Sequence, residues 1–179
     1  ILSLGMLYEL KGDINLAIEN YQKAHQLEPH NAKIHLLFAQ ALFKNKRIEE
    51  AIKEYSEIIE KNPKEVDGYI ELGFIYIEEK KYSEAIDLLK VALGKEIKTR
   101  QDELYFLLGI AYKFNQQLEE AEANYLKAIE LNPKHPRAYF YLGALYEEKN
   151  NKEEAEKYLK KAIEIDPLNA EALNYLGYM

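Results

Sequence analysis

The sequence predicts an all-α solenoid built from antiparallel helix pairs, and two observations carry this prediction. Small residues recur along the 179-residue chain at a spacing of 34 residues, with one spacing of 36. Four of the five prolines stand 24 residues after such a small residue, where a helix has to end. A repeat of this length is one supersecondary unit that buries its apolar face only by stacking on its neighbours.

Each unit contains two sets of apolar and small residues at fixed spacing. In the first set, Leu or Phe stands directly before the small residue, and Tyr or Leu stands three residues after it; the small residues are Gly5, Ala39, Gly73, Gly109, Gly143 and Gly177. In the second set, Ala follows the small residue by 12, an aromatic or Leu by 16, and a further small or aliphatic residue by 19. Each set falls on one stripe of a helix, so we expect two facing helices whose axes approach closely at the small residues.

Taken in chain order, the pattern predicts a single array of five near-complete units and part of a sixth, at about 1–31, 32–65, 66–101, 102–135, 136–169 and 170–179. Short polar segments such as Lys11-Gly12-Asp13 join the two helices of a unit. A residue followed by proline, as in Glu28-Pro29, closes the second helix. The first unit lacks its opening residues and the chain begins without Met, so we expect a fragment of a longer protein.

The junction between the third and fourth units departs from this pattern. Between Ala92 and Tyr105 it is two residues longer than its counterparts and has no proline. Either Gly94 ends the second helix early, or that helix continues to about Thr99. A tolerated loop insertion is favoured over a functional hinge, because surface connections accept such changes at little cost.

The repeated columns resemble the tetratricopeptide repeat family, whose 34-residue helix-turn-helix signature carries Leu-Gly, Tyr, Ala, an aromatic residue and Pro at these spacings. The resemblance covers the whole chain. It implies a right-handed superhelix in which the first helices of the units line a concave groove. It also implies a protein-interaction scaffold that binds an extended peptide or a partner helix in that groove.

The resemblance further assigns positions two, five, nine, twelve and thirteen of each unit to the groove, when the small residue is counted as the eighth. From these positions we expect ligand contacts by Leu36, Gln40, Phe43, Ile70, Phe74, Ile77, Phe106, Ile110, Lys113 and Phe140. Positions five and nine are mostly aliphatic or aromatic, so we predict no Lys and Asn clamp for acidic chaperone tails. An apolar wall favours an amphipathic helix or an apolar peptide, unless neighbouring first helices use these side chains to pack on one another.

Several function classes are disfavoured by composition and motifs. A net charge of -7 disfavours binding to nucleic acid, and many of the fifteen tyrosines fall in the packing columns. The chain has no Cys and no glycine-rich phosphate loop, and its histidines, His25, His30, His35 and His135, form no i, i+4 pair. We therefore predict no enzyme activity, cofactor or metal, and expect the histidines to be surface or partly packed. No apolar stretch is long enough to span a bilayer, so we predict no direct membrane insertion and a cytoplasmic location.

Two other functions remain open alternatives. The array could be a self-assembling structural scaffold, because Tyr175, Leu176, Tyr178 and Met179 have no following helix to cover them. It could also be the regulatory arm of a larger enzyme or complex. All three functions use the same fold, since a fold alone does not fix function.

Overall fold

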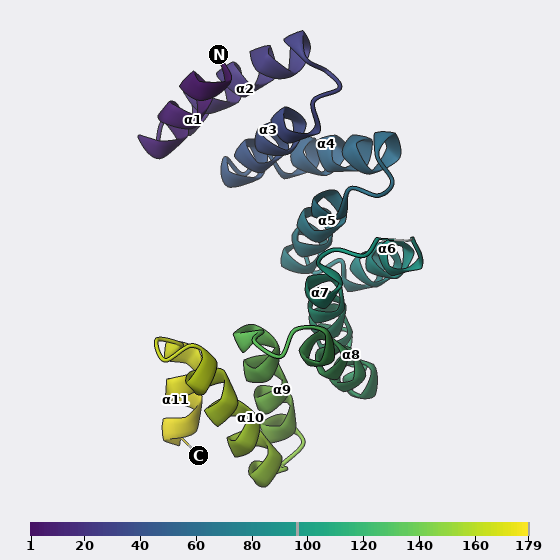
Figure 1. Cartoon of the computed structure of the whole chain (residues 1–179), viewed down its shortest axis with the longest axis vertical. Helices are drawn as coiled ribbons and strands as arrows, with labels where there is room; N and C mark the ends of the chain where they lie inside the picture. The colour runs from purple at the N-terminus through teal and green to yellow at the C-terminus, as the bar shows by residue number, and fades with distance from the viewer. Residues whose placement is uncertain (96, 179) are drawn as a thin grey trace. The chain divides into compact units, whose positions relative to one another are not determined.

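The computed structural model describes residues 1–95 and 97–178, apart from the side chain of Tyr178, and these residues form eleven α-helices and no strand (Figure 1). The helices are α1 (Leu2–Leu10), α2 (Ile14–Leu27), α3 (Ala32–Lys44), α4 (Ile48–Lys61), α5 (Val66–Glu78), α6 (Tyr82–Gly94), α7 (Gln101–Phe114), α8 (Leu118–Leu131), α9 (Pro136–Glu148), α10 (Lys152–Ile165) and α11 (Ala170–Tyr178). The predicted all-α fold is confirmed. None of these helices is both long enough and apolar enough to cross a membrane.

The chain divides into two compact units, Ile1–Ile75 and Tyr76–Met179. In the first unit α1 packs on α2, α2 on α3, and α3 on α4. In the second unit each helix from α6 to α11 packs on the next, and α9 also packs on α11. Contacts between successive helices, and the contact between α9 and α11, are those of a repeat solenoid.

The column of small residues has a direct steric cause within each helix pair. A Cβ atom added to Gly109 would lie 2.6 Å from the ring of Tyr125, and one added to Gly5 would lie 2.7 Å from the ring of Tyr21. At Gly143 the same atom would lie 2.8 Å from Leu159 Cγ. The small residues on the first helix therefore make room for the large side chains on the second.

The turns between paired helices share one backbone conformation. A residue with φ between 58° and 82° occurs once in each, at Gly12, Lys46, Lys80, Gln116 and Asn150. The next residue donates its amide to a carbonyl five residues back, as from Arg47 to Leu42 at 3.0 Å and from Asn151 to Tyr146 at 2.8 Å. This is a Schellman-type helix end, and it reverses the chain so that the second helix returns along the first.

At the long junction α6 ends at Gly94 and α7 begins at Gln101, so the alternative of a helix continuing to Thr99 is wrong. Ile97 is buried within this connection, and its carbonyl accepts a 2.6 Å hydrogen bond from Gln101 Nε2. Arg100 adopts a left-handed conformation directly before α7. An apolar side chain thus anchors the insertion to the core.

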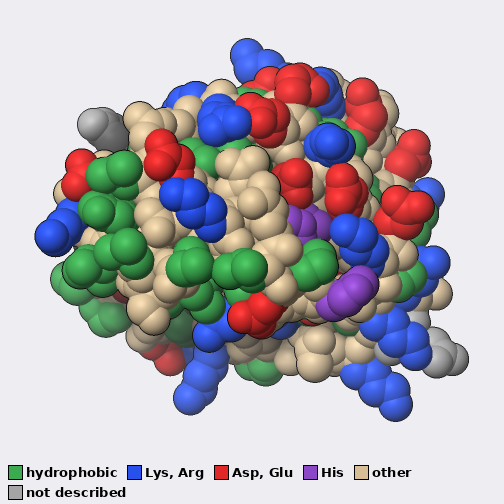
Figure 2. Space-filling view, turned by 90° about the horizontal axis from the view of Figure 1, so that it is seen from above, with side chains coloured by type: hydrophobic (Ala, Val, Ile, Leu, Met, Phe, Trp, Pro, Cys, Tyr) green, Lys and Arg blue, Asp and Glu red, His purple; other side chains and the backbone are tan. Residues whose placement is uncertain are grey.

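The molecular surface carries charges of both signs. On the face shown in Figure 2, acidic and basic side chains intermingle over much of the surface, and hydrophobic side chains gather at one side. Charges mixed in this way produce little long-range field of one sign on that face.

Candidate functional site

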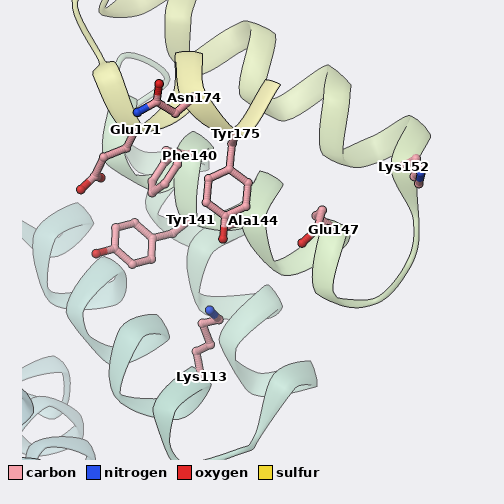
Figure 3. A pocket seen from close by; sticks show the side chains of 9 residues that line it. All are labelled: Lys113, Phe140, Tyr141, Ala144, Glu147, Lys152, Glu171, Asn174 and Tyr175. Carbon is pink, nitrogen blue, oxygen red and sulfur yellow. The ribbon is translucent and has the colours of Figure 1, made fainter. Parts of the chain in front are cut away.

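A hollow of about 670 Å³ in the second unit is the candidate functional site (Figure 3). Its lining comes from α7, α9, the start of α10 and α11, and consists of Lys113, Phe140, Tyr141, Ala144, Glu147, Lys152, Glu171, Asn174 and Tyr175. The volume lies within the range of sites that hold small ligands or side chains of a partner.

Helix geometry and capping place these side chains. Phe140, Ala144 and Glu147 are four and three residues apart, so they lie on one stripe of α9. His135 Nδ1 accepts the amide of Ala138 at 3.1 Å and caps the start of α9. The start of α11 is capped in the same way, because Asn169 Oδ1 accepts the amide of Ala172 at 2.9 Å. Side-chain caps therefore define where α9 and α11, two of the helices that line the hollow, begin.

Three aromatic rings form the floor of the hollow. Phe140 meets Tyr141 edge to face with ring centroids 5.4 Å apart, and it meets Tyr175 in the same way at 5.6 Å. Behind the floor, Phe140 belongs to a buried apolar cluster with Leu159 and Ala172. Edge-to-face contacts of this kind stabilise a fixed ring arrangement, so the floor is a defined surface.

The rim of the hollow carries charges of both signs. Lys113 Nζ lies 3.3 Å from Glu148 Oε2, which holds the ammonium group beside the opening. Lys152, Glu147 and Glu171 are exposed. Two lysines and two glutamates thus line an aromatic floor, so the site is amphipathic and close to neutral.

In the first unit, the residues predicted for the groove are mostly half-buried. Leu36, Gln40 and Phe43 are half-buried and Ile70 is buried, whereas Phe74 is exposed. The rings of Phe43 and Phe74 meet edge to face at 6.1 Å, and Gln40 donates a 3.3 Å hydrogen bond to Glu71. Phe43 and Phe74 are therefore the accessible aromatic pair of this unit.

In the second unit, most of the predicted groove residues are buried by neighbouring helices. Ile77, Ile110 and Phe140 are buried, and Phe106 is only 1% exposed. Phe106 lies 4.8 Å from the ring of His135 and 5.4 Å from that of Tyr141, and the guanidinium of Arg137 lies 4.8 Å above its face. Phe106 thus takes part in packing between helices, the alternative that the sequence left open. Of the predicted residues, Lys113 and Phe140 line the hollow.

The sequence did not predict two of the aromatic residues at the hollow as groove residues. Tyr141 and Tyr175 line the hollow and stand at position six of their repeats, which the resemblance does not assign to the groove. The sequence did contain a signal for these two residues, because position six is Tyr only in the fifth and sixth repeats. The other lining residues, apart from Lys152, fall on positions two, five, nine or twelve.

The structure also brings together a group of potential metal ligands in the first unit. His25 of α2, His35 of α3 and Glu54 of α4 offer ligand atoms that all lie within 4.8 Å of one another. Spacing along the chain did not predict this proximity, because the two histidines are ten residues apart and belong to different helices.

Models of known families match the chain in two places. Residues 10–72 match one model described as a tetratricopeptide repeat, and residues 106–170 match another with the same description. The two matches together cover more than half of the chain. Both matched ranges contain the repeated small and apolar positions described above.

Curated relatives and solved structures show the same similarity. The chain is 30% identical over 132 residues to the human protein O-mannosyl-transferase TMTC1, covering 73% of this chain and 15% of that protein. It is 29% identical over 130 residues to the BBSome complex member BBS4 of Bos taurus, covering 73% of this chain and 24% of that protein. The chain therefore spans a quarter or less of the length of these relatives. The crystal structure of TTC0263, a thermophilic TPR protein of Thermus thermophilus, superimposes with a TM-score of 0.78 at 21% identity and covers 99% of this chain and 95% of that chain.

Proposed function

Since the chain belongs to the tetratricopeptide repeat family and has the fold of a protein-interaction scaffold, we propose that it binds a peptide segment or amphipathic helix of a partner protein in the hollow between α7, α9 and α11. The proposed role is binding, without catalysis. One observation carries the proposal. The accessible Tyr175 lies beside the buried Phe140 in a hollow of about 670 Å³.

The chemistry of the hollow defines the ligand. An apolar or aromatic side chain of the partner fits against Phe140 and Tyr175, because partly exposed aromatic floors are where interfaces gain most of their binding energy. Lys113 and Lys152 attract acidic residues beside that anchor, and Glu147 attracts basic ones. The expected ligand is therefore a short segment with one apolar anchor flanked by charges of both signs.

A second contact in the first unit extends the proposal. Phe43 and Phe74 form an accessible aromatic pair there, with Leu36 and Gln40 half-buried on the preceding turns of α3. We assign these four residues to further contacts with the same class of ligand. Ile70 is buried, and so are Ile77, Phe106 and Ile110 of the second unit, so we expect these four side chains to contribute packing instead of ligand contacts.

Two relatives bear on the wider context. BBS4 is named as a member of a complex, which supports a role in holding proteins together. TMTC1 is named as a transferase, and the chain matches only 15% of it, which supports the alternative of a repeat arm attached to an enzyme. The proposed hollow serves either arrangement, because it requires only a segment of a partner protein.

Selection from a random-peptide display library on the whole chain tests the proposal, with two variants in parallel. Tyr175→Ser changes a lining residue that is 39% exposed, and Leu126→Ser is a matched control, since Leu126 is 38% exposed in the same unit but does not line the hollow. Selected peptides should bind the wild type and Leu126→Ser alike and lose at least about tenfold in affinity for Tyr175→Ser. Failure to select any saturable peptide, or equal affinity for both variants, would refute the proposal.

Self-association is a second candidate, and the exposed apolar residues of α1 favour it. Leu4, Leu7 and Leu10 of this helix are exposed, as is Leu173 of α11. The predicted contribution of Tyr178 and Met179 lies outside the described side chains. Sedimentation velocity over a wide range of protein concentration distinguishes the two functions: a dimer that Leu7→Ser disrupts would favour self-assembly, and a monomer throughout would exclude it.

A further inference from the structure

Three helices of the first unit each contribute one potential metal ligand to a single point. His25 comes from α2, His35 from α3 and Glu54 from α4, with all ligand atoms within 4.8 Å of one another. His35 Nε2 lies 2.7 Å from Glu54 Oε2, and the two imidazole ring centroids are 4.2 Å apart. The three side chains thus already converge.

His35 is buried, His25 and Glu54 are half-buried, and the hydrogen bonding of the cluster is incomplete. His35 is 3% exposed, and Nδ1 of His25 is buried without a hydrogen-bond partner among the described residues. A buried polar nitrogen without a partner destabilises a fold unless another interaction satisfies it. An imidazole nitrogen that faces a second imidazole and a carboxylate can be satisfied by coordination of a cation.

Packing alone does not require histidine at these places, because other units fill them with apolar or aromatic residues. The position of His35 is taken by Tyr69, Tyr105 and Tyr139 in the next three repeats. The position of His25 is taken by aliphatic residues, namely Ile59, Leu93, Ile129 and Ile163. In the fifth repeat, Tyr139 and Tyr158 occupy the positions of His35 and Glu54. Their ring centroids are 6.3 Å apart. The first two repeats therefore place metal-binding residue types at positions where the fold needs only bulk.

We propose that His25, His35 and Glu54 bind one divalent transition-metal ion, with Zn²⁺ as the best match. Two imidazoles and one carboxylate suit zinc, whereas Ca²⁺ and Mg²⁺ prefer all-oxygen sites. Zn²⁺ bonds of about 2.0–2.2 Å need donor atoms closer together than the widest separation here, and small side-chain rotations supply the difference. A water molecule completes the fourth position.

Charged groups of both signs lie near the cluster. Glu57 adds negative charge near His25, and Lys61 opposes it. The bound ion joins α2, α3 and α4, so it stabilises the stacking of the first two repeats.

Calorimetric titration of the chelator-treated whole chain with Zn²⁺ tests the proposal, together with the visible absorption of bound Co²⁺. We expect one saturable site, a higher Tm with Zn²⁺, and a tetrahedral Co²⁺ spectrum. His25→Gln and Glu54→Gln should each weaken Zn²⁺ binding by at least about tenfold, since each removes one ligand. Circular dichroism confirms that each variant is folded, and His35 is left unchanged because it is buried.

Two other histidines serve as controls. His30 is exposed and lies five residues before His35. His135 Nε2 lies 3.4 Å from Glu103 Oε2, a comparable buried pair that is outside the cluster. His30→Gln and His135→Gln should bind Zn²⁺ like the wild type. The proposal is overturned by the absence of saturable binding, by unchanged affinity in His25→Gln and Glu54→Gln, or by an equal loss in His30→Gln.

Discussion

Phe140 of α9 and Tyr175 of α11 meet edge to face, with ring centroids 5.6 Å apart and ring planes at 85°. The two side chains differ in environment, because Phe140 is 8% exposed and Tyr175 is 39% exposed. Phe140 also packs on Leu159 and Ala162 of α10. One member of the pair therefore belongs to the core, and the other leaves part of its ring accessible.

This difference predicts separate effects on stability. Phe140→Ala should lower the free energy of unfolding by about 3 kcal/mol, because it leaves a cavity in the apolar cluster. Tyr175→Ala should lower it by about 1 kcal/mol or less, since much of that ring is already in contact with water. Urea unfolding of the whole chain, followed by far-ultraviolet circular dichroism, measures both values. Equal losses would show that the two rings are not divided in this way.

The close approach of Gly109 to Tyr125 gives a second prediction. Alanine favours a helix interior over glycine by about 1 kcal/mol, but the added Cβ would lie 2.6 Å from the Tyr125 ring. That ring is fully buried and touches Phe106 and Tyr141, so it has little room to move. Gly109→Ala should therefore lower the melting temperature, with a net cost of about 1–2 kcal/mol. Gly94→Ala is the control: its Cβ would meet nothing within 4 Å, so any loss as large as that of Gly109→Ala would contradict the steric explanation.

The tyrosines that follow the small residue by sixteen form a third test, because their hydroxyl groups are not equivalent. Tyr21 donates a 2.7 Å hydrogen bond to Glu9, whereas the buried hydroxyl of Tyr125 has no partner among the described residues. Tyr21→Phe should cost about 1–2 kcal/mol of stability, since it removes a bond to a charged group. Tyr125→Phe should be neutral or stabilising by up to about 1 kcal/mol, because it removes an unpaired buried hydroxyl. Chemical denaturation of both variants decides the matter, and a larger loss for Tyr125→Phe would reveal a missing partner.

The packing of the repeat was predictable because it depends on local spacing. Gly109 and Tyr125 are sixteen residues apart in a pattern that recurs along the chain, so the sequence alone indicated that they face each other. The family resemblance assigned Lys113 and Phe140 to the groove, and both line the hollow. Periodicity specifies which side of a helix a residue occupies, and this is sufficient for the fold.

Exposure and contacts between different units were not predictable in this way. Phe106 stands at a position that the family resemblance assigns to the groove, but Tyr141 and Arg137 of α9 cover its ring. A pattern within one repeat does not predict which side chains of the next repeat contact it. His25 and His35 belong to successive repeats, and they meet because α2 packs on α3. Their departure from the Tyr and aliphatic residues of the other units was the available signal.

Glu103 of α7 contacts His135 and Arg137 at the start of α9, and these contacts give the last prediction. Its Oε1 accepts a 2.6 Å bond from Arg137, and its Oε2 lies 3.4 Å from His135 Nε2. Because His135 Nδ1 accepts the amide of Ala138, the proton of the neutral imidazole is on Nε2 and faces Glu103. Burial alone would raise the pKa of Glu103, but the hydrogen bond with His135 and the charge of Arg137 outweigh it and lower the pKa.

A carboxyl group whose pKa is lower in the folded state stabilises the fold at a pH above the pKa of the unfolded chain, which is about 4.3 for Glu. This contribution is lost as the pH falls through the folded pKa, because protonation then breaks the contacts with Arg137 and His135. In Glu103→Gln the free energy of unfolding should therefore be lower than in the wild type near pH 7, and it should fall less steeply below about pH 4.3. Urea unfolding at a series of pH values measures the slope. Glu119→Gln, at a side chain that is 84% exposed, should follow the wild-type curve, and a parallel curve for Glu103→Gln would exclude the proposed linkage.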